Sequence, residues 1–206
     1  MERELDKFSK PGRPTRSFAA LALTGALAIL AGCSGGSDDG GPPVLPCTDL
    51  LLRHDLTSPV AGDVYLQQID ATCTTVDVAV YVKDLGGIFT VGFDLTYPAA
   101  QLSYLSYTLG LLLQTGSTTT PFHTVLNPAP GTLQVTASRL NPDLPVTATG
   151  SEILFVLRFQ RVAMGTGVVD FDTSGGSVFP EEIRDDSMAL VPASFGPGHG
   201  GTVLVP

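Results

Sequence analysis

An oxygen-rich segment near the C-terminus offers the most specific chemistry in this 206-residue sequence. Asp170, Asp172 and Ser174 alternate, a glycine follows, and Glu181 comes after five further residues. This spacing is close to the calcium loop of EF-hands, in which alternate oxygens and a final bidentate glutamate surround the ion. The alternative is a β-strand that ends in a glycine turn, since no helical pattern flanks the segment. Calcium is therefore a possible cofactor, and no other cofactor is indicated.

Residues that could serve a nucleophilic or hydrolytic mechanism are scattered. The three histidines, His54, His123 and His199, lie far apart in segments that look like loops or tails. No serine or cysteine has the G-x-S-x-G context of a nucleophile elbow. A carboxylate pair for glycoside hydrolysis is not excluded by spacing, but the acidic pairs at 181–182 and 185–186 are typical of a solvated loop. We expect a binding protein rather than an enzyme.

A short apolar run that ends in a cysteine defines the N-terminus. The segment has the three parts of a secretory signal: a basic region with Arg13 and Arg16, an apolar stretch, and small residues at its end. The stretch is shorter than the ~20 residues of a comfortable membrane span. Its ending, Leu30-Ala31-Gly32-Cys33, resembles the lipobox of bacterial lipoproteins. The resemblance implies that residues 1–33 are a lipoprotein signal and that Cys33 is lipidated.

Two alternatives to lipidation remain, an ordinary cleaved signal with an unmodified Cys33 and an uncleaved anchor. Ser34 stands where an aspartate would favour retention at the inner membrane in Gram-negative sorting. The expected location is therefore the cell envelope, with the outer membrane or cell surface as first choice. Residues 34–46 have the Gly, Ser, Asp and Pro content of a flexible linker. Residues 47–206 are long enough for one domain with its own core.

The charge and the remaining cysteines restrict the partners and the compartment. After the signal the chain keeps 6 basic and 17 acidic residues. Such an acidic surface repels phosphate backbones, so nucleic acid is a poor partner. Cys47 and Cys73 are an even pair outside the cytoplasm, which favours a disulfide. Two thiols without a nearby histidine are a weak metal site by comparison.

Alternating apolar and polar residues recur throughout the domain and predict β-strands. The pattern is clearest at 76–83 and 89–97, and it returns at 133–138, 153–160, 168–171 and 202–205. Glycine- and proline-rich turns lie between these segments, for example at 85–87, 127–131 and 174–176. No segment after Cys33 has a convincing helical stripe. Short alternating strands at such spacing are typical of an all-β sandwich.

The order of these segments resembles that of the cohesin domain family. The alternating valines at 76–82 are followed by Gly86-Gly87, then by FDLTYP (93–98) and LSY (102–104). Further on, GTLQVTASRL (131–140), ILFVLRFQRVAMGTGVVDF (153–171) and the closing GGTVLV also match family patterns. One turn departs from the family: Pro98-Ala99 stands where members carry Asp-Pro after the tyrosine.

The resemblance implies a jelly-roll β-sandwich of about nine strands, similar in shape to carbohydrate-binding modules. It also implies a non-catalytic role in docking, because cellulosomal cohesins bind the calcium-loaded dockerin domains of secreted enzymes. A dockerin-like protein is therefore the first partner to consider. A structural envelope lipoprotein without a specific ligand is a further alternative. A resemblance of this kind predicts the fold better than it predicts the function, because one fold can carry many functions.

A polar sheet face is the candidate surface for protein docking. Outward positions of two predicted strands would form it: Thr90, Asp94, Thr96, Gln134, Thr136 and Ser138. The alternative to docking is that these residues form an ordinary solvated outer face of the sheet. Direct polysaccharide binding is the alternative function, and it needs exposed planar rings. The domain has no tryptophan, Tyr97 and Tyr104 fall on apolar faces, and the tyrosines that could be exposed are Tyr65, Tyr81 and Tyr107.

Overall fold

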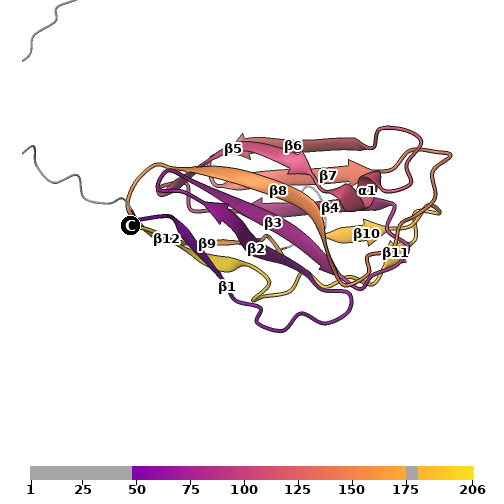
Figure 1. The fold of residues 1–206 in the computed structure, drawn as a ribbon, viewed down its shortest axis with the longest axis horizontal. Coiled ribbons are helices and arrows are strands. Elements are labelled where there is room, and N and C mark those ends of the chain that lie inside the picture. The colour runs from indigo at the N-terminus through magenta and orange to yellow at the C-terminus, as the bar shows by residue number, and fades with distance from the viewer. Residues whose placement is uncertain (1–47, 175–180) are drawn as a thin grey trace, which may run out of the picture. The chain divides into compact units, whose positions relative to one another are not determined.

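The computed structural model describes residues 48–174 and 181–206. These residues form twelve strands and one short helix (Figure 1). The strands are β1 (Leu51–His54), β2 (Val64–Ala71), β3 (Thr75–Lys83), β4 (Thr90–Thr96), β5 (Leu102–Leu109), β6 (Phe122–Ala129), β7 (Thr132–Ser138), β8 (Ser151–Arg161), β9 (Gly165–Phe171), β10 (Glu182–Arg184), β11 (Leu190–Val191) and β12 (Gly201–Val205). The helix α1 spans Leu111–Gln114.

The strands build two antiparallel sheets that pack face to face. The smaller sheet has the order β2-β3-β8-β5, and the larger one runs β1-β12-β9-β4. One edge of β4 pairs with β7, which pairs with β6; the other edge pairs with β9 over one half and with β10 over the other. The expected all-β sandwich is confirmed. The described residues hold twelve strands rather than about nine, partly because β10 and β11 are only three and two residues long.

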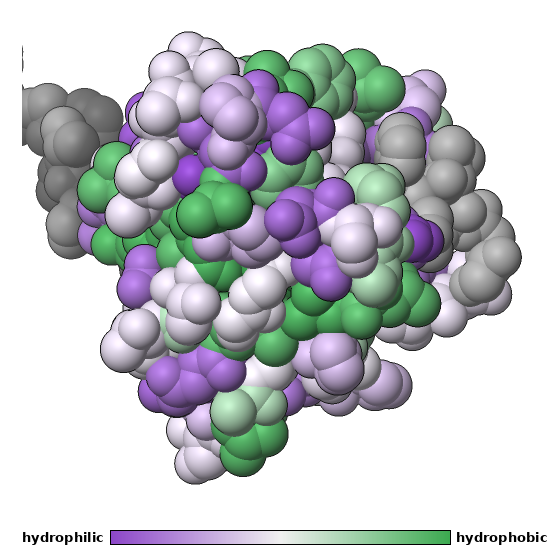
Figure 2. Space-filling view, turned by 90° about the vertical axis from the view of Figure 1, so that its right-hand side faces the viewer, coloured by the Kyte–Doolittle hydropathy of each residue, from purple (hydrophilic) through white to green (hydrophobic). Residues whose placement is uncertain are grey.

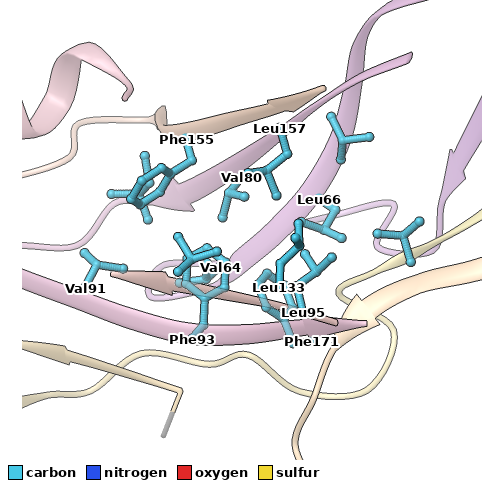
Figure 3. Close-up of a cluster of buried hydrophobic side chains, with 14 of the residues drawn as sticks. Val64, Leu66, Val80, Val91, Phe93, Leu95, Leu133, Phe155, Leu157 and Phe171 are labelled. Atoms are coloured by element: carbon cyan, nitrogen blue, oxygen red, sulfur yellow. The ribbon is translucent and has the colours of Figure 1, made fainter. Parts of the chain in front are cut away.

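Apolar residues at alternate strand positions meet between the sheets (Figure 3). Val80, Phe155 and Leu157 point inward from the smaller sheet, while Phe93 and Leu133 point inward from the larger one. All five side chains are fully buried. Period two is the spacing of a strand with one buried face, so the same pattern that predicts the strands also assigns the core.

The two ends of the described chain lie together. Thr48 and Pro206 line one shared groove, at the end of the sandwich opposite α1 and the β10–β11 hairpin (Figure 1). No helix among the described residues is long and apolar enough to cross a membrane.

Candidate functional site

The six residues of the predicted docking face do lie on one face of the larger sheet. In the β4–β7 pair Thr90 stands opposite Ser138, and Asp94 stands opposite Gln134. Residues directly opposite each other in an antiparallel pair point to the same side. The hydroxyls of Thr90 and Ser138 are 2.8 Å apart and share a hydrogen bond. Five of the six side chains are partly exposed, in contrast to the buried inward positions between them.

The burial of Asp94 differs from the expectation that it is an exposed member of this face. Its side chain is only 3% exposed, so it does not offer a carboxylate to a partner at the surface. Alternation assigned Asp94 to the correct side of the strand but does not say what packs over it. The docking face is therefore defined by the other predicted residues and not by Asp94.

Strand β6 widens this face with residues that the sequence analysis missed. Phe122, Thr124 and Leu126 stand opposite Ser138, Thr136 and Gln134 respectively. Phe122 and Leu126 are 55% and 49% exposed, so this side of the face presents two large apolar side chains to solvent. A segment that contains Asn127-Pro128 reads as a turn, so its pairing with β7 was not visible in the sequence.

The β10–β11 hairpin continues the face on the other side of β4. Arg184 stands opposite Thr90 on one side and opposite Leu190 on the other, and Glu182 stands opposite Gly92. Nε and Nη2 of Arg184 each donate to a carboxylate oxygen of Glu182 at 2.7 Å. Leu190 is 65% exposed. The charges of Arg184 and Glu182 thus neutralise each other.

The resulting surface, called the docking face below, has a simple composition. It is a row of hydroxyl and amide side chains with exposed apolar residues at both sides, and it spans five strands. At about 4.8 Å per strand these five strands are roughly 20 Å across. Its members are Thr90, Thr96, Phe122, Thr124, Leu126, Gln134, Thr136, Ser138, Glu182, Arg184 and Leu190.

Figure 2 views the domain from the end that carries α1 and the β10–β11 hairpin, where the docking face terminates. Apolar areas are visible there, and polar residues separate them. Leu111, Leu144 and Leu190 are 77%, 72% and 65% exposed. Several large apolar side chains are thus exposed at the end of the domain away from the chain termini.

A buried carboxylate holds the loop that leads into β6. Asp143 accepts hydrogen bonds from the hydroxyls of Ser117, Thr118 and Thr119 and from the Thr118 amide. Nearby, the buried Arg139 guanidinium donates to the carbonyls of Leu113 and Thr115 at 2.7 and 3.0 Å. Together these contacts fix residues 113–119, so that β6 starts beside β7.

The donors around Asp143 predict a pH-dependent stability. Hydrogen bonds from Ser117 and Thr118 hold the pKa of the Asp143 carboxyl well below its usual range. A pKa that is lower in the folded state stabilises the fold above the unfolded value, about 3.9, and this contribution is lost as the pH falls toward the folded pKa. We expect Asp143→Asn to lower the melting temperature at pH 7, and the difference from wild type to shrink below about pH 4. A difference that stays constant from pH 7 to pH 2 would contradict this role.

The predicted calcium ligands do not all come together. The pKa of Glu181 is raised by burial and by the nearby carboxylates of Asp172 and Asp94. The pKa of Asp170 is also raised by burial, but its charged neighbours are Asp55 and His199. Within residues 48–174 and 181–206, no group of three or more His, Cys, Asp or Glu side chains could hold a metal ion. Residues 175–180 of the loop lie outside the described part, so calcium there stays a prediction.

The predicted cysteine sites fall mostly outside the described residues. Cys33, the linker 34–46 and Cys47 all do. Cys73 lies in the turn between β2 and β3. The amide of Leu50, three residues after Cys47, donates to the Thr72 carbonyl at 3.0 Å. The chain just after Cys47 therefore runs beside the turn that carries Cys73, and the disulfide stays a prediction.

Comparisons with known proteins identify the type of fold. No protein-family model and no curated protein sequence matches the chain. A type II cohesin domain from the cellulosome of Acetivibrio cellulolyticus matches in structure with a TM-score of 0.52 and 14% identity, over 70% of this chain and 94% of that chain. The sixth cohesin from scaffoldin B of the same organism, solved in complex with a Cel5 dockerin, matches with a TM-score of 0.51 and 17% identity, over 69% and 97%.

Two antiparallel sheets in this order define the chain as a β-sandwich module. The sandwich is cohesin-like, as the order of sequence motifs indicated. At these identities the likeness establishes the fold alone.

Proposed function

We propose that this protein is a non-catalytic docking module that holds a dockerin-like protein on its docking face. The observation that supports it most is the composition of that face on a cohesin-like fold. Phe122 and Leu190 flank a hydroxyl-rich centre with its one ion pair satisfied internally. Aromatic residues such as Phe122 are enriched in protein–protein interfaces relative to the rest of the surface.

The size of the face fits the same proposal. A stable protein interface buries about 800 Å² on each partner. Strands β4, β6 and β7 are seven, eight and seven residues long. At ~3.4 Å per residue and roughly 20 Å across, the face covers several hundred Å², which approaches that size. A flat β-sheet face also needs little rearrangement on binding, which keeps the entropic cost low.

We also propose that the module is displayed at the bacterial outer membrane through a lipidated Cys33. The 13-residue linker at 34–46 would span about 20 Å on average as a flexible chain. The chain enters the sandwich at the end opposite α1 and the β10–β11 hairpin. A tether from that end leaves the docking face accessible to a partner from solution.

A pull-down from the culture supernatant of the source organism tests the docking proposal. The immobilised mature chain is compared with a Thr136→Arg variant, which places a long cation at the centre of the docking face without touching the core. We expect a dockerin-bearing protein to be retained by the wild type, lost with Thr136→Arg and lost with EDTA, because dockerins carry calcium. Retention of nothing, or equal retention by both chains, would contradict docking through this face.

A further inference from the structure

The smaller sheet has an outer face of its own, on the side of the sandwich away from the docking face. The strand register places its outward residues in rows across β2, β3, β8 and β5. One row contains Tyr65, Tyr81 and Ile153. The next contains Gln67, Ala79, Val156 and Thr108. Apolar and aromatic side chains thus follow one another across the sheet, with Gln67 and Thr108 at the two sides. We call this band, formed by Tyr65, Tyr81, Ile153, Ala79 and Val156, the tyrosine band.

A stacked pair of tyrosines holds one aromatic ring of this band in a fixed orientation. The rings of Tyr65 and Tyr81 stack with centroids 5.5 Å apart and an interplanar angle of 15°. Tyr65 is only 4% exposed, so it acts as a support, whereas Tyr81 is partly exposed. Since Tyr65 covers one face of the Tyr81 ring, the opposite ring face is directed toward β8. The Tyr81 hydroxyl keeps its proton at neutral pH and can donate a hydrogen bond, and burial raises its pKa further.

A groove continues the band over β8 and β5. It has a volume of about 430 Å³, within the range of small-ligand pockets. Its floor is mostly aliphatic, and Thr108, Ser151 and Glu152 supply polar groups at its rim. The full lining is Thr108, Leu109, Gly110, Leu111, Leu112, Ser151, Glu152, Ile153 and Val156.

Gly110 is what allows one wall of the groove to form. A Cβ at this position would lie 1.9 Å from the Ile153 carbonyl oxygen, so only glycine lets the chain pass so close to β8. The Gly110 amide donates to the Leu154 carbonyl at 2.8 Å, which holds the start of α1 against the strand. Leu111, 77% exposed, then projects beside the groove.

Both basic side chains of β3 and β8 on this face, Lys83 and Arg158, are paired with carboxylates. Arg158 donates from Nε and Nη2 to the two carboxylate oxygens of Asp77 at 2.7 and 2.6 Å. Lys83 and Asp84 form a second pair at 3.1 Å. The rest of the polar surface around the band holds the carboxylates of Asp70 and Glu152 together with amides and hydroxyls, including Gln67, Ser106, Thr108 and Gln160. Since both cations are paired and two further carboxylates are present, an anionic ligand is disfavoured, and a ligand matched to this face is neutral and rich in hydrogen-bonding groups.

We propose that the tyrosine band binds a neutral glycan chain. A pyranose ring has an apolar C–H face and a rim of hydroxyls, so it matches both the Tyr81 ring with the aliphatic floor and the surrounding amides and hydroxyls. An apolar peptide would use the floor but leave the polar rim unmatched, and buried polar groups without partners cost binding energy. On this proposal the module has two binding faces, one for a protein and one for a neutral polysaccharide.

Affinity electrophoresis of the mature chain tests this inference. The gels contain a soluble neutral polysaccharide (mixed-linkage β-glucan, xylan or galactomannan) or anionic polygalacturonate. We expect retardation by at least one neutral polymer and none by polygalacturonate. Tyr81→Ala and Thr108→Arg should weaken that binding about tenfold or more, which is the loss of one good contact. Tyr81→Phe, which keeps the ring, should bind within about twofold of wild type.

The control is Thr136→Arg on the docking face, which should bind the glycan as wild type does. A thermal melt of each variant verifies folding, and Thr108→Arg tests the site even if Tyr81→Ala is unstable, because Thr108 is an exposed residue. The inference is overturned if no neutral polymer retards the wild type. It is also overturned if Tyr81→Ala and Thr108→Arg bind normally, or if these variants lose only a protein partner in the pull-down. Loss of protein retention by Thr136→Arg alone concerns the docking proposal and leaves the glycan result unaffected.

Discussion

We expect Phe93→Ala to lower the free energy of unfolding by about 3–5 kcal/mol, the largest single effect of any substitution discussed. Phe93 is fully buried. Its ring contacts those of Phe155, Phe171 and Phe195, with centroids 6.0, 5.4 and 6.1 Å away. Truncation removes these ring contacts and leaves a cavity between the two sheets. Urea denaturation followed by circular dichroism measures the loss.

Phe122→Ala is the matched control, because it removes the same side chain from the exposed side of the sandwich. Phe122 is 55% exposed, so we expect a change in unfolding free energy of no more than about 0.5 kcal/mol. On the docking proposal, Phe122→Ala should instead weaken binding of the protein partner. Similar losses of stability for both variants would mean that the core is not where the sandwich places it.

The second large effect concerns the predicted disulfide between Cys47 and Cys73. Closing a loop of this length stabilises a fold by roughly 3.5 kcal/mol in the chain-entropy model. The bond would fasten the segment before β1 to the β2–β3 turn, beside the Leu50–Thr72 hydrogen bond. We expect Cys73→Ser to lower the free energy of unfolding by about that amount.

Reduction supplies the control for this substitution. Dithiothreitol should bring the wild type to the stability of Cys73→Ser and should leave the variant unchanged. Mass spectrometry of the alkylated, unreduced protein should show no free thiol at Cys47 or Cys73. Two alkylated thiols, or a wild type whose stability does not respond to reductant, would contradict the disulfide.

Period-two patterning predicted the central strands because each has one buried face. The predicted segment 89–97 contains β4, and the alternating valines at 76–83 lie within β3. The outward positions of β4 and β7 followed from the same pattern, and so five residues of the docking face were predictable. Turn signals were also informative: Gly87 and Gly131 have φ of 78° and 93°, values that favour glycine.

The elements that the sequence did not reveal lack this local pattern. Strand β6 carries Asn127-Pro128, and β10 and β11 are too short for any period to show. Leu111–Gln114 continues an apolar run, yet it forms a helix where the close passage at Gly110 turns the chain. The burial of Asp94 depends on what covers its strand. Phe122 and Leu190 join the docking face only through pairing between distant strands, which no single segment encodes.

The tyrosines considered for polysaccharide binding were equally hard to assign from the sequence. Tyr65 and Tyr81 were both expected to be candidates for exposure, and the structure buries Tyr65 while stacking it on Tyr81. Tyr107 bonds to Nδ1 of His123 at 3.0 Å, between the sheets, and so it does not extend the tyrosine band. Sequence alone could not choose among the three, because the choice depends on cross-strand neighbours.

Calorimetric titration of the wild-type mature chain with the calcium-loaded dockerin module that the pull-down identifies tests the docking function most directly. We predict saturable binding to the wild type, binding weakened by about 100-fold or more in Thr136→Arg, and unchanged binding in Tyr81→Ala. The absence of binding to the wild type, or equal affinity for wild type and Thr136→Arg, would contradict docking through this face.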